Sequence, residues 1–254
     1  MSGKISVTSH PKSVDVKYLI SLFINLAWIL PSNAQSAYEI IQQHIEAIGG
    51  DQWDSVSTFY ILATTNDEQG HITIAKTVVK DSSVRNDITI ESVSASRSEK
   101  KYYLILDGDK GWKHLPRERN YAVNTLYKEE VAILWEELDY EDPFLRYLQK
   151  ERTIDLMKIV YDEDKEYYMF SVTYKSGKQQ YCYINTSTLM MDIVQTVGRE
   201  GIVRYNDYKK TPEGLMIARE INSEAGTVHI TDIRINPIVS RDIFKPNETL
   251  SVHN

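Results

Sequence analysis

The regular spacing of short β-prone runs along the C-terminal part of the chain restricts its fold more than any other feature. Runs rich in Val, Ile, Tyr and Thr are separated by turn-forming stretches such as 175–178, 198–201, 211–214 and 224–226. Strands that follow one another about every 8–12 residues are typical of antiparallel sheets and barrels. No strand–helix–strand alternation is present, so a parallel α/β core is not expected. The predicted strands of this part are 154–161, 166–174, 179–185, 189–197, 202–209, 215–222 and 227–236.

Four further strands and three helices are predicted before this series. Apolar residues at spacings of three and four predict a helix over Ser36–Ile48, which Gly49-Gly50 would end. The same spacing of apolar residues predicts a second helix over Thr125–Leu138. Asp142-Pro143 is typical of the cap and first-turn proline of a third, short helix that reaches Leu148. The strands are 58–65, 72–80, 84–93 and 101–107, of which the first two flank a hairpin loop at 66–70.

Residues 1–34 have the pattern of an export signal. Lys12 and Lys17 precede the apolar stretch Tyr18–Leu30, and Pro31-Ser32-Asn33-Ala34 offers a cleavage site of small residues. The apolar stretch has thirteen residues, whereas a membrane-spanning helix needs roughly 20. An uncleaved anchor or a buried helix is the alternative. We expect a signal peptide over 1–34 and a single exported domain over 35–254, in a periplasm or outside the cell, without a lipid anchor because no cysteine follows the apolar stretch.

The composition excludes several classes of function. A formal net charge of −7 and a pI of about 5.4 argue against a nucleic-acid-binding surface. The single cysteine, Cys182, cannot form an intramolecular disulfide and is expected to pack within its strand. His44 lies on an apolar helical stripe, as a core histidine would. No GxSxG, P-loop, GxGxxG or HExxH motif occurs, so no enzymatic activity, catalytic residue, metal or cofactor is expected.

Several predicted strands carry apolar or aromatic residues on both faces. In the strand 166–174, Tyr167 and Met169 alternate with Tyr168, Phe170, Val172 and Tyr174. One face of such a strand packs on the sheet's own core, and the other needs a second apolar neighbour. Two interpretations stay open at this point. Helices could close over the second face as ordinary core, or a cavity for lipid or acyl chains could lie between the helices and the sheet.

Four segments, in this order, carry a resemblance to a known family. They are the first helix with its glycine stop (37–50), a "DG…GW" turn (107–112), a "DY…GL.IP" hairpin (206–218) with Ala218 in place of the usual proline, and a closing "N…F..P" segment (236–246). Over residues 36–247 the chain resembles the periplasmic outer-membrane lipoprotein-sorting (LolA-like) family, especially a diverged branch found in Gram-negative bacteria with complex envelopes.

The resemblance implies a mainly β (α+β) fold: an incomplete antiparallel β-barrel, in which helices cover the concave mouth of a strongly curved sheet. Family members shield the acyl chains of lipoproteins in an apolar cavity while carrying them across the periplasm. The implied partners are therefore acyl chains of a lipoprotein or lipid, with membrane-bound donor and acceptor proteins. The helix 36–48 and the insertion 125–150 would form the lid. An arginine on an early strand holds the lid in the main branch, but no local motif assigns that role to Arg85.

The predicted function is that of a non-enzymatic periplasmic carrier or sensor that shields acyl chains. One alternative is an envelope protein–protein interaction module without a lipid ligand, and another is a secreted hydrolase with a non-standard site. The residues predicted to line the apolar cavity are Tyr103, Trp112, Val131, Leu134, Trp135, Leu138, Tyr168, Phe170 and Tyr174.

Overall fold

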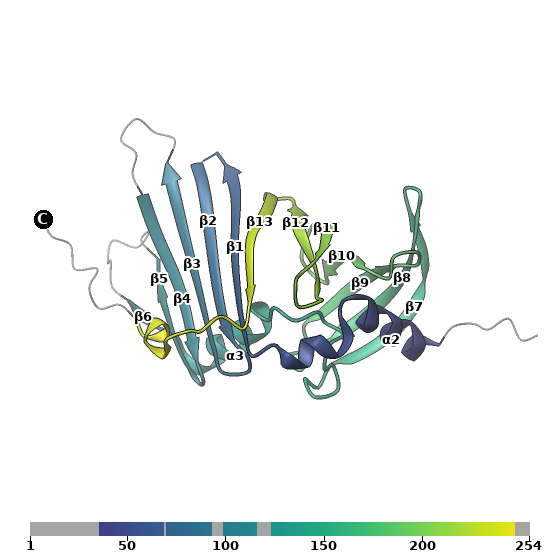
Figure 1. The fold of residues 1–254 in the computed structure, drawn as a ribbon, viewed down its shortest axis with the longest axis horizontal. Coiled ribbons are helices and arrows are strands. Elements are labelled where there is room, and N and C mark those ends of the chain that lie inside the picture. The colour runs from purple at the N-terminus through teal and green to yellow at the C-terminus, as the bar shows by residue number, and fades with distance from the viewer. Residues whose placement is uncertain (1–35, 69, 93–98, 116–122, 247–254) are drawn as a thin grey trace, which may run out of the picture. The chain divides into compact units, whose positions relative to one another are not determined.

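The computed structural model describes residues 36–68, 70–92, 99–115 and 123–246, so the predicted signal segment 1–34 lies outside the described residues. Within these residues, thirteen strands form one antiparallel sheet (Figure 1). The strands are β1 (Thr58–Asp67), β2 (Gly70–Val79), β3 (Ser83–Ser92), β4 (Glu99–Asp107), β5 (Lys110–His114), β6 (Asn124–Thr125), β7 (Thr153–Asp162), β8 (Lys165–Thr173), β9 (Gln179–Asn185), β10 (Met191–Thr196), β11 (Val203–Lys210), β12 (Met216–Ser223) and β13 (Gly226–Ile235). Each strand predicted from the sequence is confirmed, with ends that differ by a few residues.

The order of the strands explains how the sheet is covered. The order is β6-β5-β4-β3-β2-β1-β13-β12-β11-β10-β9-β8-β7, so the first and last long strands pair in the middle and β6 and β7 form opposite edges. The sheet is strongly curved and unclosed, which makes it an incomplete barrel. Because β6 and β7 are consecutive along the chain but lie at opposite edges, the segment between them has to cross a face of the sheet. We call this connection, residues 126–152, the lid segment.

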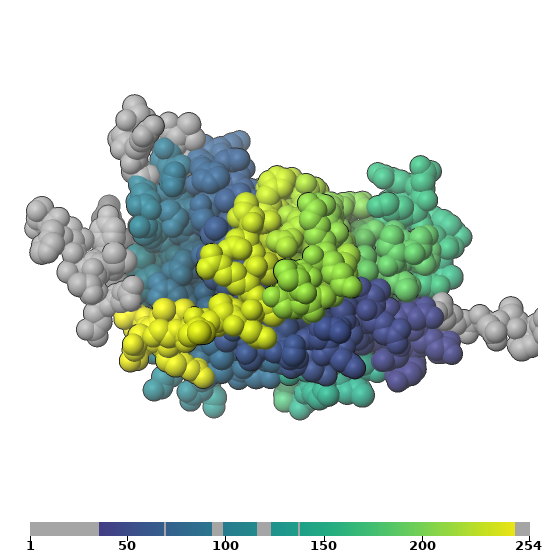
Figure 2. Space-filling model, viewed as in Figure 1, coloured from purple at the N-terminus to yellow at the C-terminus, as the bar shows by residue number. Residues whose placement is uncertain are grey.

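The first predicted helix is confirmed as α2 (Ala37–Ala47), with Ile40, Ile41 and His44 buried. It stops at Gly49, whose φ of +128° suits glycine and whose missing Cβ leaves room for Leu215. The chain then continues into a short 3₁₀ helix, η1 (Gly50–Ser55). The Met216 amide donates to the Ile48 carbonyl at 2.9 Å, and Figure 2 shows α2 and η1 running directly beside the last strands.

The second predicted helix is confirmed as α3 (Lys128–Glu137), but the third, from Asp142 to Leu148, is wrong. Asp142 does begin a turn, because its carboxylate accepts from the Phe144 amide at 2.9 Å. Arg146 then has a φ of +50° and cannot continue a right-handed helix. Its guanidinium is held by acidic groups from two sides, so tertiary ion pairs override the local preference for a helix. No helix in the described part of the chain combines the length and apolar character needed to cross a bilayer.

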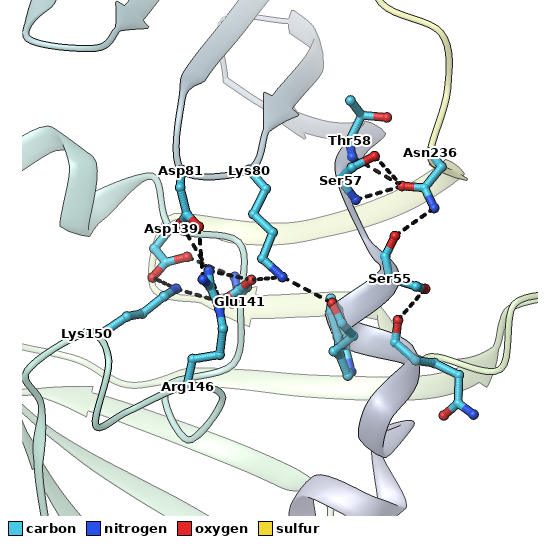
Figure 3. A network of polar contacts seen from close by, with 12 residues as sticks. Ser55, Ser57, Thr58, Lys80, Asp81, Asp139, Glu141, Arg146, Lys150 and Asn236 are labelled. Atoms are coloured by element: carbon cyan, nitrogen blue, oxygen red, sulfur yellow. Dashed lines mark hydrogen bonds and ion pairs between the residues drawn. The ribbon is translucent and has the colours of Figure 1, made fainter.

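The closing segment that resembles the family's "N…F..P" pattern has two structural roles. The Asn236 side-chain oxygen accepts from the Ser57 and Thr58 amides at 2.7 and 3.2 Å, and its nitrogen donates to the Ser55 carbonyl at 3.0 Å (Figure 3). This clamp joins the end of β13 to the start of β1. Phe244, in the 3₁₀ helix η2 (Arg241–Phe244), is buried on the sheet.

The two faces of the sheet have separate cores. The face that carries Val78, Val84 and Leu106 packs against the lid segment, and we call it the inner face. On the outer face, Tyr103 and Ile105 pack with Phe244. A third cluster lies between α2 and the strands β8–β10; its members are Ile40, Ile41, Phe144, Phe170, Val172, Tyr174, Cys182, Ile184, Met191 and Val194. The two-sided apolarity of β4 is thus explained by cover on both faces.

Candidate functional site: a covered inner face with three cavities

The lid segment approaches the sheet closely at its start. The Leu126 amide donates to the Gly111 carbonyl at 2.8 Å. A Cβ at Gly111 would lie 2.6 Å from a Leu126 methyl and 2.9 Å from a Val131 methyl, so a larger residue there would force these side chains to shift. The capping box of α3 is completed by Glu130, whose carboxylate accepts from the Tyr127 amide at 2.8 Å.

After Val131, the described side chains of α3 are only partly buried or exposed. Val131 is the only buried side chain among those described between Tyr127 and Tyr140. Leu134, Trp135 and Leu138 are partly buried against the inner-face core. The Trp135 indole also donates to the Gly108 carbonyl at 3.0 Å, which gives the predicted "DG" turn a role in holding the lid segment.

A buried lysine ties the end of α3 to the sheet. Lys76 lies on β2 and its ammonium group donates to the Leu138 carbonyl. Burial lowers the pKa of Lys76 to about 8, although the nearby Asp139 carboxylate acts in the opposite direction. Arg85 instead lies on the outer face, where it donates to the Ile243 carbonyl at 2.7 Å and pairs with Asp87. Of these two cations on β2 and β3, Lys76 and not Arg85 reaches the lid segment.

A network of ion pairs fixes the second half of the lid segment (Figure 3). Glu141 is 2% exposed and accepts from Arg146 at 2.8 Å and Lys150 at 2.7 Å, with Lys80 of the β2–β3 turn at 3.5 Å. Arg146 also pairs with Asp81 of the same turn at 2.9 Å, and these hydrogen bonds raise the pKa of its guanidinium. Charged groups that are buried as completely as Glu141 depend on such partners.

Asp139 extends this network toward the strands β7 and β8. Its carboxylate pairs with Lys150 at 2.6 Å and with Arg152, which is itself almost fully buried. Burial raises the pKa of Asp139, but the two cations and their hydrogen bonds outweigh it, so the pKa lies below its usual range. Arg152 stacks over the ring of Tyr174 at 4.9 Å.

His44 connects α2 with the lid segment. One ring nitrogen lies 2.6 Å from the Leu189 carbonyl oxygen and the other 3.2 Å from the Asp142 carboxylate. Burial lowers the pKa of His44, but the Asp142 carboxylate and the hydrogen bonds raise it by more, so the net pKa is above its ordinary value. The expectation of a core histidine is confirmed by its complete burial.

Three cavities lie along this covered face. The central cavity, of about 290 Å³, has apolar walls from β1 and β10–β13 and a charged roof from the lid segment. Its wall includes Phe59, Ile61, Met191, Val194, Ile217, Ala218, Ile221 and Ile230, and its roof includes Glu136, Asp139, Glu141, Asp142 and Arg152. The lid cavity, of about 240 Å³, adjoins it, and Tyr140, stacked on Phe59 at 4.9 Å, lines both. The α3 cavity, of about 420 Å³, lies between β3–β5 and α3.

The residues predicted to bind ligand fall into three groups. Leu134 lines the α3 cavity, Trp135, Leu138 and Tyr174 line the lid cavity, and Tyr174 also borders the central cavity. Val131, Tyr168 and Phe170 pack in the core clusters, where Phe170 meets Phe144 edge to face at 5.2 Å. Tyr103 borders the α3 cavity, but its ring stacks on His114 at 5.3 Å, and Trp112 packs beside it in the outer-face cluster.

Sequence reasoning missed the residues that hold the lid segment. Lys76, Glu141 and Arg152 form buried polar contacts between elements that are far apart in the sequence. The only local signal is the density of charged residues of both signs from Asp139 to Arg152, and a charged surface has the same composition.

The free thiol of Cys182 is buried. Burial raises the pKa of the Cys182 thiol, which keeps it protonated and unreactive. No group of three or more His, Cys, Asp or Glu side chains within the described ranges is placed to hold a metal ion. The arrangement is suited to enclosing an amphipathic molecule, with apolar walls beneath charged groups.

These features place the fold in the LolA-like class: a curved, unclosed antiparallel sheet with few helices and a covered inner face. The structure is similar to that of a LolA superfamily protein from Nitrosomonas europaea, with a TM-score of 0.50 and 13% identity over 81% of this chain and 96% of that one. It is equally similar to a DUF1329 family protein from Desulfovibrio piger, with a TM-score of 0.50 and 15% identity over 81% and 95% of the two chains. No family model matches the sequence, and no curated protein does. At these identities the likeness establishes a shared fold.

Proposed function

We propose that this protein is a non-enzymatic carrier or sensor of the bacterial envelope, which shields the acyl chains of a lipid or lipoprotein in its central cavity. The observation that carries the proposal is the composition of that cavity, with apolar walls from β1 and β10–β13 beneath a charged roof. Removing a chain from a membrane costs about 0.8 kcal/mol per CH₂, so a carrier needs an apolar surface of this kind. The LolA-like fold agrees with the proposal.

The lid segment supplies a way to open the cavity. Its second half is anchored, because Phe144 and Leu145 are buried and Glu141 is held by three cations. Its first half is packed tightly on the sheet only at its start, by Leu126 and Val131. The rest of α3 is held largely by polar contacts, which are the hydrogen bonds from Lys76 and Trp135 to main-chain carbonyls, the Lys113–Glu130 ion pair and the hydrogen bond from the Ser176 amide to the Glu136 carboxylate. Such bonds can be exchanged for water at small net cost, whereas buried apolar contacts cannot. We infer that the end of α3, which carries Glu136 of the roof, moves away while residues 141–152 stay in place.

Export is part of the proposal. We propose that cleavage near Ala34 releases a chain that starts near Gln35 or Ser36 and works in the periplasm, with membrane-bound donor and acceptor proteins as partners. N-terminal sequencing of the protein from an envelope fraction tests this. Recovery of residues such as Lys17 at the N-terminus would contradict it.

The binding test combines extraction with a matched pair of variants. Lipid extraction and mass spectrometry of the natively purified protein should recover acyl chains, and the delipidated protein should bind the fluorescent fatty acid cis-parinaric acid. Ile217→Trp fills the central cavity and should weaken this binding at least tenfold. Ile238→Trp, at a fully exposed position, is the control and should change nothing. A protein that yields no lipid and binds no fatty acid would refute the proposal.

The alternative function, an interaction module without lipid, is favoured by the edge strand β7. Met157, Ile159 and Tyr161 are exposed on this strand, and an unpaired edge is a common docking site for an extended peptide. A photo-crosslinking residue at position 159 should capture an envelope protein if this alternative holds. Capture combined with no extracted lipid would favour it over the carrier.

A further inference from the structure

We propose that the edge strand β7 pairs with β7 of a second copy of this chain, so that the two sheets join across a two-fold axis. β7 is ten residues long, and in the described sheet it has a neighbour, β8, on one side only (Figure 1). Met157, Ile159 and Tyr161 are 55%, 52% and 77% exposed on it. Natural proteins seldom leave a long edge with apolar side chains uncovered. The proposal does not rest on the carrier function, because β7 lines none of the three cavities described above.

A bulge in β7 decides which registers such a pair can adopt. Leu156 lies opposite Phe170 of β8. The next pair joins Lys158 to Met169, so Met157 is an extra residue and the alternation of faces shifts by one there. A two-fold axis keeps every side chain on its own face, and residues opposite each other in an antiparallel pair share a face. The numbers of two paired residues from opposite sides of the bulge must therefore differ by an odd number, whereas in a regular strand they would differ by an even one.

One register of this kind matches the charges of β7 with their opposites. It places Asp155 opposite Lys158 of the second copy, and by symmetry Lys158 opposite Asp155 of the second copy. The two residues share a face of the sheet, because Asp155 lies opposite Ser171 of β8 and Lys158 opposite Met169. Both side chains are exposed, and neither has an ion-pair partner among the described residues. The second copy would therefore supply a partner for each charge.

The same register joins apolar residues on the other face. Ile154 would lie opposite Ile159 of the second copy, on the face that carries the cluster between α2 and β8–β10. The neighbouring registers that the bulge allows would place Lys158 opposite Thr153 or Met157 and leave the charges unpaired. Exposed ion pairs contribute little affinity, so the charges select the register. Main-chain hydrogen bonds and the covered apolar side chains supply the affinity.

Charge reversal tests the pairing, with the mass of the natively purified protein followed by analytical ultracentrifugation. The protein should form a concentration-dependent dimer. Asp155→Lys and Lys158→Asp each turn both pairs into like charges at exposed positions, and each should raise the dissociation constant of the dimer at least about tenfold. An equimolar mixture of these two variants restores both pairs and should form a mixed dimer, as should the double variant with itself. Glu213→Lys makes the same charge change at an exposed turn and should leave the constant unchanged.

Amide hydrogen exchange locates the contact. Exchange should slow in β7 as the protein concentration rises, and it should stay the same in β6 at the opposite edge of the sheet. The proposal is overturned if the protein stays monomeric up to about 100 µM, if the single charge reversals leave the dimer unchanged, if their mixture fails to pair, or if exchange slows outside β7 instead. Crosslinking of position 159 to another envelope protein, in a chain that stays monomeric, would overturn it in favour of peptide docking at this edge.

Discussion

Two helices cover the sheet, and they are packed in different ways. α2 buries Ile40, Ile41 and His44 against β8–β10, in a cluster of ten buried residues. α3 buries only Val131 among its described side chains and has cavities on both sides. Both segments have helical apolar spacing in the sequence, so amphipathicity alone does not distinguish a fixed cover from a movable one. The two helices differ in how many buried apolar side chains the strands facing them supply.

The largest effect should come from emptying the core under α2. Phe170 is fully buried and packs edge to face on Phe144, so Phe170→Ala should lower the free energy of unfolding by about 3–5 kcal/mol. Leu134→Ala under α3 should cost less than about 2 kcal/mol, because Leu134 is only partly buried and already borders a cavity. Urea denaturation of both variants checks this. Equal costs would contradict the proposed difference between the helices.

The next effect concerns the anchored half of the lid segment. Glu141→Gln should lower stability by about 3 kcal/mol, since it leaves Arg146, Lys150 and Lys80 without their shared carboxylate. Glu213→Gln, at an exposed turn position, is the control and should stay within about 0.5 kcal/mol. Thermal unfolding measures both. A small loss at Glu141 would mean that the lid segment is free along its whole length.

A pH dependence should reveal the lysine that ties α3 to the sheet. The pKa of Lys76 falls from 10.5 to about 8 on folding, so between these values the unfolded chain binds more protons than the native one. Stability should therefore rise from pH 8 to pH 10, by about 2 kcal/mol. Lys76→Met should remove this rise while the other titrating groups contribute as before. A profile that is the same in both proteins would show that the lysine is solvated.

Local pattern was enough to predict most of the fold. The strand runs, both long helices and the turns follow from apolar spacing and from glycine and proline, which act over a few residues. The pairing of β1 with β13 joins residues such as Phe59 and Ile235, and no local signal records it. That pairing makes β6 and β7 opposite edges and sends the lid segment across the sheet, so the cover could be predicted only from the family resemblance.

The candidate site was less predictable for a related reason. Alternation along β4 separates Leu104 from Tyr103, but it does not say which of the two faces the lid segment. Alternation along β8 likewise does not say which face Phe170 lies on. Its contacts with α2 and Phe144 place it in the cluster under α2. Buried polar groups such as Lys76 are also invisible in the sequence, since their partners are main-chain carbonyls brought close by folding.

The smallest effects should have opposite signs at two tyrosines of the central cavity. The Tyr140 hydroxyl is buried and has no hydrogen-bond partner among the described residues, whereas the Tyr208 hydroxyl donates to the Met191 carbonyl at 2.6 Å. Tyr140→Phe should leave the ligand-free protein unchanged or raise its stability by up to about 1 kcal/mol, and Tyr208→Phe should lower it by about 1 kcal/mol. Denaturant midpoints of the delipidated variants measure both.

If the ligand's head group engages Tyr140, Tyr140→Phe should also weaken fatty-acid binding several-fold although it does not destabilise the protein. A loss of stability at Tyr140 similar to that at Tyr208 would mean that its hydroxyl is already paired without ligand, and that the part of the lid segment nearest the central cavity is as firmly held as the strands.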